Sequence, residues 1–247
     1  MSRIIVWFSC GAASAVAAKK TLEQYGHSHQ VEIIYCNTLS SEHPDNKRFM
    51  AQCTIWFGQP ILVISSQDYQ SVDDVFERTR YMSGVRGARC TTELKKIPRL
   101  QFAQPDDIHV FGYTANEKLR IKKFEARNPE LKLLWILRDL GITKSDCYRE
   151  LMRVPLRLPE MYLLGFDNNN CPGCVKASSP WYWSMVRKHF PDVFKRRCEQ
   201  SRKLGVRLVE IHHHDRIFLD ELPEREFKKR GKKENLSCGP ECGGPSK

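Results

Sequence analysis

Two cysteines separated by two residues are the part of this chain best suited to chemistry. Cys171 and Cys174 form a C-x-x-C sequence, and the Pro-Gly pair between them shapes a turn. This spacing lets two thiolates bind the same metal ion or cluster. A redox-active dithiol of the thioredoxin type would sit at a strand-to-helix junction of a thioredoxin fold, which the flanking sequence does not indicate. A zinc site would need four ligands, and Cys238 with Cys242 could complete it.

A second candidate site is a run of small and hydroxyl-bearing residues between an apolar segment and a helical one. Small side chains let backbone N–H groups approach phosphate oxygens, and the N-terminus of the following helix adds partial positive charge. The same residues also occur in ordinary tight strand-to-helix turns, so both interpretations stay open from these residues alone. The candidate phosphate loop consists of Ser9, Cys10, Gly11, Ala12, Ala13 and Ser14.

Strands and helices alternate along the segments that would position these residues. Apolar, β-branched runs predict strands at 3–9, 31–36, 60–64 and 108–112, and helical patterns predict helices at 12–25, 45–57, 72–81, 92–103 and 116–127. The alternation is typical of an α/β fold, a Rossmann-like parallel sheet flanked by helices. We expect a nucleotide-binding α/β domain at 1–135, a helical region with the C-x-x-C motif at 136–222, and a basic, cysteine-containing tail at 223–247.

Regular signals are fewer after residue 135. Helices are predicted at 145–152 and from Ser179-Pro180 onward, with a late strand at 207–211. The Trp-Tyr-Trp sequence at 181–183 could stack on bases, but at the start of a helix it is better explained by packing. The sequence His-His-His-Asp at 212–215 could bind a metal, although adjacent strand residues point to opposite faces, which favours a polar strand end or turn.

Charge and cysteine content limit the class of protein. The 247-residue chain has a formal net charge of +11, which favours nucleotides, phosphates or nucleic acid as partners, although a solvated basic face gives the same composition. No apolar run reaches the roughly 18 residues of a membrane helix, so no membrane partner is expected. The N-terminal apolar stretch at 4–8 is shorter than the about 7–15 residues of an export signal. We therefore expect the ten cysteines to stay reduced in a cytoplasmic protein.

Three segments together resemble a known family. Residues 9–14, residues 90–98 (CTTELKKIP) and residues 112–120 (GYTANEKLR) resemble, in order, the SGGxDS-type PP-loop, the cysteine-pair-then-RKxxPL segment and the G-x-R-x-x-E/Q-S-x-x-R segment. These belong to the phosphoadenosine-phosphosulfate (PAPS) reductase and adenylylsulfate reductase family of the ATP-pyrophosphatase superfamily. The likeness covers roughly residues 1–180. The chain is also similar to PAPS-reductase-like proteins encoded by bacteriophages, which suggests a viral origin.

The resemblance implies an oxidoreductase acting on sulfur that binds an adenine nucleotide, which would be PAPS, adenylyl sulfate or ATP. It implies a [4Fe–4S] cluster, with zinc as the alternative, held by Cys90, Cys171 and Cys174. Thr91 replaces the second member of the family's cysteine pair, so the fourth ligand would come from Cys238 or Cys242, from a small molecule, or not be needed.

The family's catalytic groups also have counterparts here. Cys242 lies in a Glu-Cys-Gly segment that resembles the family's C-terminal ECG-x-H, and would attack the substrate sulfur before a thioredoxin-like partner reduces the product. The same cysteine could instead be the last cluster ligand. Lys95 and Arg120 would stabilise phosphate or sulfate charge, and Gly112 and Glu117 would complete the nucleotide site.

The sequence also departs from the family pattern. Ala13 and Thr114 stand where the family often carries Asp and Arg, which weakens the case for the usual Mg–ATP chemistry. Glu42 and His43 could compensate, while Asp45 is better explained as the cap of the following helix. Two other functions therefore stay open: an ATP-dependent sulfurtransferase acting on tRNA or DNA, and a non-catalytic nucleotide-binding module. The sequence does not distinguish a monomer from a homodimer.

Overall fold

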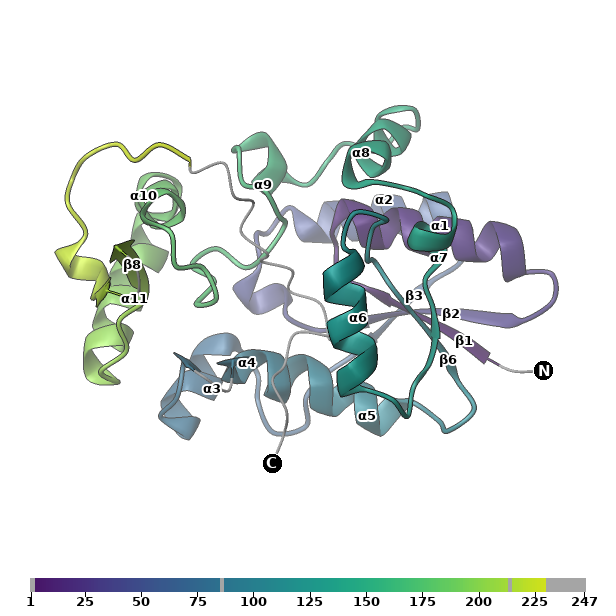
Figure 1. Ribbon diagram of the computed structural model, residues 1–247, viewed down its shortest axis with the longest axis horizontal. Helices are drawn as coiled ribbons and strands as arrows, with labels where there is room; N and C mark the ends of the chain where they lie inside the picture. The colour runs from purple at the N-terminus through teal and green to yellow at the C-terminus, as the bar shows by residue number, and fades with distance from the viewer. Residues whose placement is uncertain (1–2, 85–86, 213–214, 230–247) are drawn as a thin grey trace.

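A parallel sheet forms the centre of the computed structural model, which describes residues 3–84, 87–212 and 215–229 (Figure 1). Within these residues its five strands are β1 (Arg3–Phe8), β2 (Gln30–Cys36), β3 (Ile61–Ile64), β6 (Ile108–Phe111) and β7 (Lys132–Leu134). Their order is β3-β2-β1-β6-β7, and every neighbouring pair is parallel. The predicted α/β fold, a Rossmann-like parallel sheet flanked by helices, is therefore confirmed.

β1 is the central strand and is buried on both faces. Ile4 and Val6 pack into the hydrophobic cluster on one face of the sheet, and Ile5 and Trp7 pack into the cluster on the other. A strand covered on both sides needs apolar side chains at every position. This is why the buried part of the strand, from Ile4 to Phe8, is a continuous apolar run.

Helices cover both faces of the sheet (Figure 1). On one face lie α1 (Ala12–Tyr25) and α2 (Asn46–Phe57), and α7 (Ile136–Asp139) and α8 (Lys144–Met152) pack against α1. The other face is covered by α5 (Ile97–Phe102) and α6 (Lys118–Arg127), through Phe102, Ile121 and Phe124. α7 and α8 thus share the core of the sheet, although they follow residue 135.

A separate hydrophobic cluster joins the C-terminal helices to the segment between β3 and β6. Its core includes Phe76, Met82, Met161 and Trp183. The elements of this part are α3 (Val72–Thr79), the hairpin of β4 (Ser83–Gly84) and β5 (Gly87–Ala88), α9 (Glu160–Leu163), α10 (Pro180–His189), α11 (Pro191–Lys203), the hairpin of β8 (Val209–His212) and β9 (Asp215–Ile217), and η3 (Leu219–Glu221). This cluster brings the C-x-x-C segment beside residues 72–96.

Local predictions for this part are largely confirmed. Ser179 caps α10 by accepting a hydrogen bond from the Tyr182 N–H, and Pro180 occupies the first turn. Tyr182 and Trp183 are buried, as the packing interpretation of the Trp-Tyr-Trp sequence requires. β8 ends at His212, in agreement with a polar strand end. None of the helices in the described ranges is long and apolar enough to cross a membrane.

The helix predicted at 92–103 is present, but it is not a regular α-helix throughout. It consists of α4 (Arg89–Thr91), the π-helical η2 (Thr92–Lys96) and α5. A π-helical segment inserts an extra residue into a turn, and such segments occur frequently at functional sites. Lys95 lies within this segment, so its backbone geometry differs from that of a regular helix.

Candidate functional site

The sheet reverses its winding direction between β1 and β6. β2 and β3 lie on one side of β1, while β6 and β7 lie on the other. In open parallel sheets, ligands bind beyond the carboxyl ends of the strands at such a switch point. The loop at 9–14 follows β1, and Gly112 follows β6. The structure therefore places the candidate phosphate loop and Gly112 at the edge of the sheet where ligands are expected.

The loop after β1 is held by its own hydrogen bonds. Cys10 adopts a positive φ of 54°, and the Ser14 hydroxyl accepts from the Ser9 N–H at 3.1 Å and donates to the Gly11 carbonyl at 2.9 Å. Burial raises the pKa of the Cys10 thiol, so this thiol stays protonated. Cys10, Ala12 and Ser14 are buried, whereas Ser9, Gly11 and Ala13 are half-buried.

Gly112 has a packing role at this loop. A Cβ atom at this position would lie 2.7 Å from the Ser14 backbone nitrogen and 3.1 Å from the Ala13 carbonyl carbon. Only glycine lets the end of β6 approach the first turn of α1 this closely. The close approach explains Gly112 without a ligand.

Tyr162 of α9 lies against the N-terminus of α1. Its hydroxyl accepts hydrogen bonds from the Ala12 N–H, at 3.2 Å, and from the Asn169 N–H. Burial raises the pKa of Tyr162 to about 12, so the hydroxyl is neutral. A helix N-terminus attracts anionic oxygen atoms. The tyrosine oxygen thus occupies a position suited to an oxygen of a bound phosphate.

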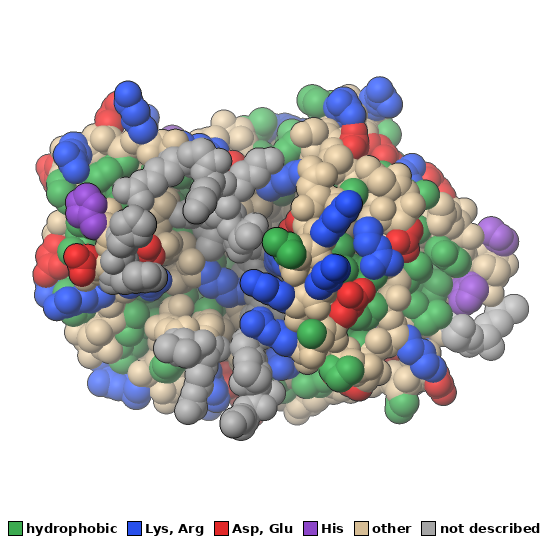
Figure 2. Space-filling view, viewed as in Figure 1, with side chains coloured by type: hydrophobic (Ala, Val, Ile, Leu, Met, Phe, Trp, Pro, Cys, Tyr) green, Lys and Arg blue, Asp and Glu red, His purple; other side chains and the backbone are tan. Residues whose placement is uncertain are grey.

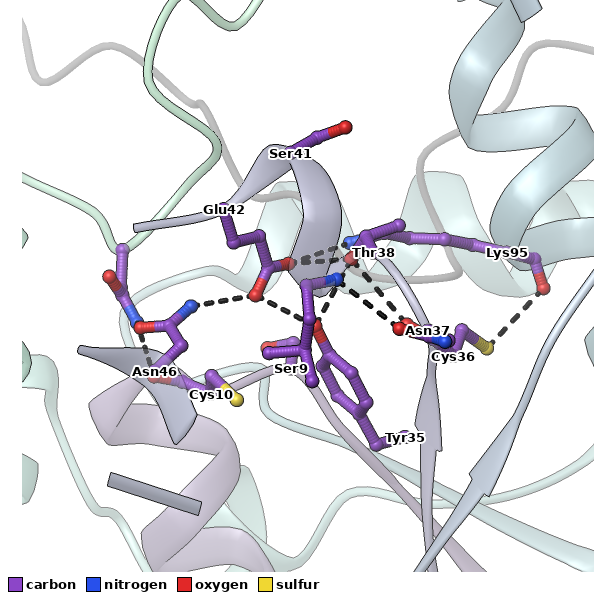
Figure 3. A network of polar contacts seen from close by, with 12 residues as sticks. Ser9, Cys10, Tyr35, Cys36, Asn37, Thr38, Ser41, Glu42, Asn46 and Lys95 are labelled. Carbon is purple, nitrogen blue, oxygen red and sulfur yellow. Dashed lines mark hydrogen bonds and ion pairs between the residues drawn. The ribbon is translucent and has the colours of Figure 1, made fainter. Parts of the chain in front are cut away.

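Glu42 is the centre of a buried polar network beyond β2 (Figure 3). Its carboxylate accepts hydrogen bonds from the Tyr35 hydroxyl at 2.7 Å, the Thr38 hydroxyl at 2.6 Å and the Asn46 amide at 2.6 Å. Lys95 Nζ lies 3.8 Å from the same carboxylate. All five residues are buried. Burying a carboxylate is costly unless hydrogen bonds and an opposite charge compensate it, and this network supplies both.

The network connects the loop after β1 with Lys95. The Asn169 amide donates to the Cys10 carbonyl and to the Asn46 side-chain oxygen, each at 2.7 Å. Asn46 in turn donates to Glu42, which pairs with Lys95. Hydrogen bonds and one ion pair therefore run without interruption from the candidate phosphate loop to Lys95.

The prediction that the Asp45 side chain caps α2 is wrong. Asp45 occupies the N-cap position, but its carboxylate makes no capping hydrogen bond to the described residues of α2. It accepts instead from Arg48 at 2.6 Å and from the Glu160 N–H at 2.9 Å. The Arg48 guanidinium, one turn later in the helix, lowers the pKa of Asp45. Asp45 therefore ties α2 to α9.

Cys90, Cys171 and Cys174 border the same narrow cavity, of about 20 Å³, although Cys90 is distant in sequence. Cys171 and Cys174 are buried, and Cys90 is half-buried. The space between the side chains holds one or two waters, so a larger group would require the thiols to turn outward. Other residues that border this cavity are Thr38, Thr91, Lys95, Lys176 and Arg197.

The C-x-x-C turn is held from two sides. The Tyr182 hydroxyl accepts from the Cys174 N–H at 2.8 Å and donates to the Cys171 carbonyl at 3.3 Å. On the other side, Arg197 Nε donates to the Gly173 carbonyl at 3.2 Å. Gly173 has a φ of +68°, which glycine adopts without strain. These contacts fix the backbone that carries both thiols.

Replacing Gly173 by Ala should destabilise the protein by more than about 1 kcal/mol. The new Cβ would be strained at this φ and would lie 2.7 Å from Val193 Cγ1. Gly205 is a matched control, because its φ is +67° and nothing lies within 4 Å of its Cβ position. Urea unfolding of both variants measures the difference. If Gly173→Ala loses no more stability than Gly205→Ala, the contact with Val193 does not contribute to the loss.

The donor set of the cavity suits a thiolate-bound metal group. Three thiols face one space, and the cations of Lys95, Lys176 and Arg197 also border it, where they would offset thiolate charge. In the ranges that the structure describes, no three His, Cys, Asp or Glu side chains are placed to hold a single metal ion. The thiols therefore share a cavity without converging on one point. Cys238 and Cys242 lie outside the described residues.

Arg120 and Glu117 form a separate pair at the end of β6. Arg120 donates to Glu117 at 2.7 Å and lies over the Tyr113 ring at 4.5 Å. The other Glu117 oxygen accepts from the Thr114 N–H and hydroxyl, at 2.9 and 3.0 Å. Neither Arg120 nor Glu117 is among the described residues that border the cysteine cavity. The structure thus brings Lys95, but not Arg120, to the cysteines.

Sequence reasoning missed several residues of this site. Tyr162 and Arg197 had no signal that distinguished them from ordinary packing residues. Asn169 belongs to an Asn-Asn-Asn run directly before the C-x-x-C motif, and an amide-rich run beside candidate ligands was a usable signal. Thr91 was noted only as a departure from the family pattern, although it borders the cavity.

The fold and the site define an α/β protein with a doubly wound parallel sheet and a cysteine-lined cavity beyond its carboxyl edge. No protein-family model matches the sequence, and no curated protein matches it either.

Proposed function

We propose that this protein is an enzyme that binds an adenine nucleotide at the switch point and reduces or transfers sulfur with the help of an iron–sulfur cluster. The observation that carries the proposal is the shared cavity of Cys90, Cys171 and Cys174. The hydrogen-bonded connection from the loop at 9–14 to Lys95, which borders this cavity, supports it. The resemblance to PAPS and adenylylsulfate reductases suggests which reaction the site would perform.

The resemblance to adenylylsulfate reductases favours a cluster over a single ion. A Zn–S bond of about 2.3 Å brings the sulfurs of a tetrahedral zinc site to about 3.8 Å from one another. A [4Fe–4S] cluster takes one cysteine on each iron, which spreads its ligands more widely. Three cysteines from two distant segments that border one cavity are compatible with the second case. When bound, such a cluster would supply redox or charge-stabilising chemistry beside the nucleotide.

Lys95 would link the two halves of the site. Its ammonium group pairs with Glu42 at 3.8 Å and borders the cysteine cavity. A fixed cation in a low-dielectric site stabilises the negative charge of a bound sulfate or phosphate group. Lys95 would therefore hold the anionic end of the nucleotide toward the thiols.

In the reductase version the nucleophile is the Cys242 thiolate, which lies outside the described residues. It attacks the sulfonyl sulfur of adenylyl sulfate or PAPS, and the bond from sulfur to the phosphate oxygen breaks, releasing the nucleotide. A dithiol of a thioredoxin-like partner then reduces the cysteine thiosulfonate. Sulfite leaves, the partner becomes a disulfide, and Cys242 is regenerated.

Sulfite release tests this version directly. Protein prepared without oxygen should release sulfite from adenylyl sulfate or PAPS with reduced thioredoxin, and Cys242→Ser should abolish the release. Tight nucleotide binding without turnover would identify a non-catalytic module instead.

The net charge of +11 favours an ATP-dependent sulfurtransferase as the second candidate. Lys and Arg side chains gather in the middle of the face that Figure 2 shows. Basic surfaces of this kind attract nucleic acid. ATP-to-AMP conversion that depends on added tRNA or DNA, without sulfite release, would establish this function in place of the first.

Replacing Tyr162 by Phe should strengthen nucleotide binding several-fold. The change removes the hydroxyl oxygen that accepts from the Ala12 and Asn169 N–H groups, and both donors then face the position of a phosphate oxygen. Tyr148→Phe is the control, because it removes a neighbouring hydroxyl, on a ring that packs edge-on against Tyr162, and leaves the Tyr162 oxygen in place. Calorimetric titration with AMP and ATP measures the effect. Unchanged or weaker binding would show that the tyrosine does not compete with phosphate.

A further inference from the structure

The Thr91 hydroxyl is a buried polar group that the structure leaves without a hydrogen-bond partner. Thr91 is 1% exposed, and its Oγ1 has no partner among the described residues. Buried hydroxyl groups almost always have such a partner, because an unmade hydrogen bond costs stability. Thr91 also borders the cavity of the three cysteines. An unsatisfied buried hydroxyl at a ligand cavity indicates a missing partner in that cavity.

The position of Thr91 in its helix explains why the chain itself does not satisfy it. A helical threonine usually donates to the carbonyl three or four residues earlier. α4 begins at Arg89, and the preceding residue, Ala88, is extended with φ −89° and ψ 122°. The earlier carbonyls therefore belong to strand β5 rather than to a helical turn. The Thr91 hydroxyl therefore depends on a hydrogen-bond partner in the cavity that it borders.

The chemistry of the cavity limits what the hydroxyl can bind. Lys95, Lys176 and Arg197 carry hydrogen-bond donors and no side-chain acceptor. Thr38 donates its own hydroxyl to Glu42 at 2.6 Å. Apart from the Thr38 oxygen, which belongs to the Glu42 network, the side-chain acceptors that border the cavity are therefore sulfur atoms, either of the cysteines or of a group that they hold.

We propose that the Thr91 hydroxyl donates a hydrogen bond to a sulfur atom of the iron–sulfur group held by Cys90, Cys171 and Cys174. The inference rests on the proposed function, since it needs that group. A hydrogen bond to sulfur stabilises the more negative, reduced state of a cluster and so raises its reduction potential. Thr91 would thus be a positioning residue that sets the potential and has no part in ligation.

The test compares Thr91→Val with Thr91→Ser in the full-length chain prepared without oxygen. Valine keeps the shape and removes the hydroxyl, whereas serine keeps the hydroxyl. Spectroelectrochemical titration should show a more negative potential for Thr91→Val and a potential near that of the wild type for Thr91→Ser. In metal-free protein Thr91→Val should melt at a higher temperature than the wild type, because it removes an unsatisfied hydroxyl.

The possible failures are distinguishable. An iron-loaded wild type whose potential is unchanged by Thr91→Val overturns the role of Thr91 and leaves the cluster in place. A metal-free Thr91→Val variant that melts below the wild type shows that the hydroxyl has a protein partner, which also overturns the inference. Wild-type protein that binds no iron overturns the proposed function and the role of Thr91 with it.

Discussion

Cys90→Ser protein prepared without oxygen should retain about a tenth or less of the iron that the wild type binds. Cys90 shares its cavity with Cys171 and Cys174, so the proposed site loses one of three thiolate ligands. Loss of a supporting residue around a metal already costs about 10–100-fold in affinity, and loss of a ligand should cost at least as much. A serine hydroxyl stays protonated near neutral pH and does not replace a thiolate. Iron analysis and the visible absorbance measure the loss.

Cys198→Ser is the matched control for this experiment. Cys198 is also half-buried and packs against the same hydrophobic cluster, but it is not among the described residues that border the cavity. It should keep the iron content of the wild type. Full iron content in Cys90→Ser, or an equal loss of iron in both variants, would show that Cys90 is not a ligand.

Lys95→Met should destabilise the protein by about 3–5 kcal/mol, the usual cost of breaking a buried ion pair. The Lys95 and Glu42 side chains are 5% and 2% exposed, so water cannot replace the lost cation. Methionine has a similar volume, and the loss should therefore come from the uncompensated charge of Glu42. The free energy of unfolding from urea titration of metal-free protein measures it.

A double-mutant cycle separates charge from packing. Lys95→Met with Glu42→Gln removes both charges, and the amide oxygen can still accept from Tyr35 and Asn46 while the amide nitrogen donates to the Thr38 hydroxyl oxygen. The double variant should be more stable than Lys95→Met alone. If Glu42→Gln recovers none of the stability lost in Lys95→Met, Lys95 does not stabilise the Glu42 carboxylate. The proposed connection between the loop at 9–14 and the cavity would then lack its ion pair.

The sheet and its helices could be predicted from the sequence because burial on both faces leaves a strong local pattern. The run at 4–8 is apolar throughout, and the predicted helix at 12–25 coincides with α1. The same logic located β2, β3 and β6, whereas β7 was not predicted as a strand. These elements depend on neighbouring residues, so the sequence alone was sufficient.

Features that depend on contacts between distant segments could not be predicted. Asp45 was expected to cap α2, but its carboxylate accepts hydrogen bonds from Arg48 and from the backbone N–H of Glu160 instead. Tyr162 meets the Ala12 N–H from a helix 150 residues away in the chain. The helical pattern at 92–103 does not reveal its π-helical segment, because one inserted residue leaves the apolar spacing nearly unchanged.

The candidate site was predictable in outline and not in detail. The C-x-x-C motif and the resemblance at 90–98 suggested that Cys90 joins Cys171 and Cys174, and the structure places all three on one cavity. Glu42 and Lys95 were both named as candidates, but the sequence did not show that they pair, because they lie 53 residues apart in the chain. Cys238 and Cys242 lie outside the described residues, so their roles stay predictions.

The iron and acid-labile sulfide content of the wild-type chain, purified without oxygen, tests the central claim most directly. We expect about four iron and four sulfide atoms per chain, with the broad visible absorbance of a thiolate-bound cluster. Zinc in place of iron, or a colourless protein that takes up no iron on reconstitution, would contradict it.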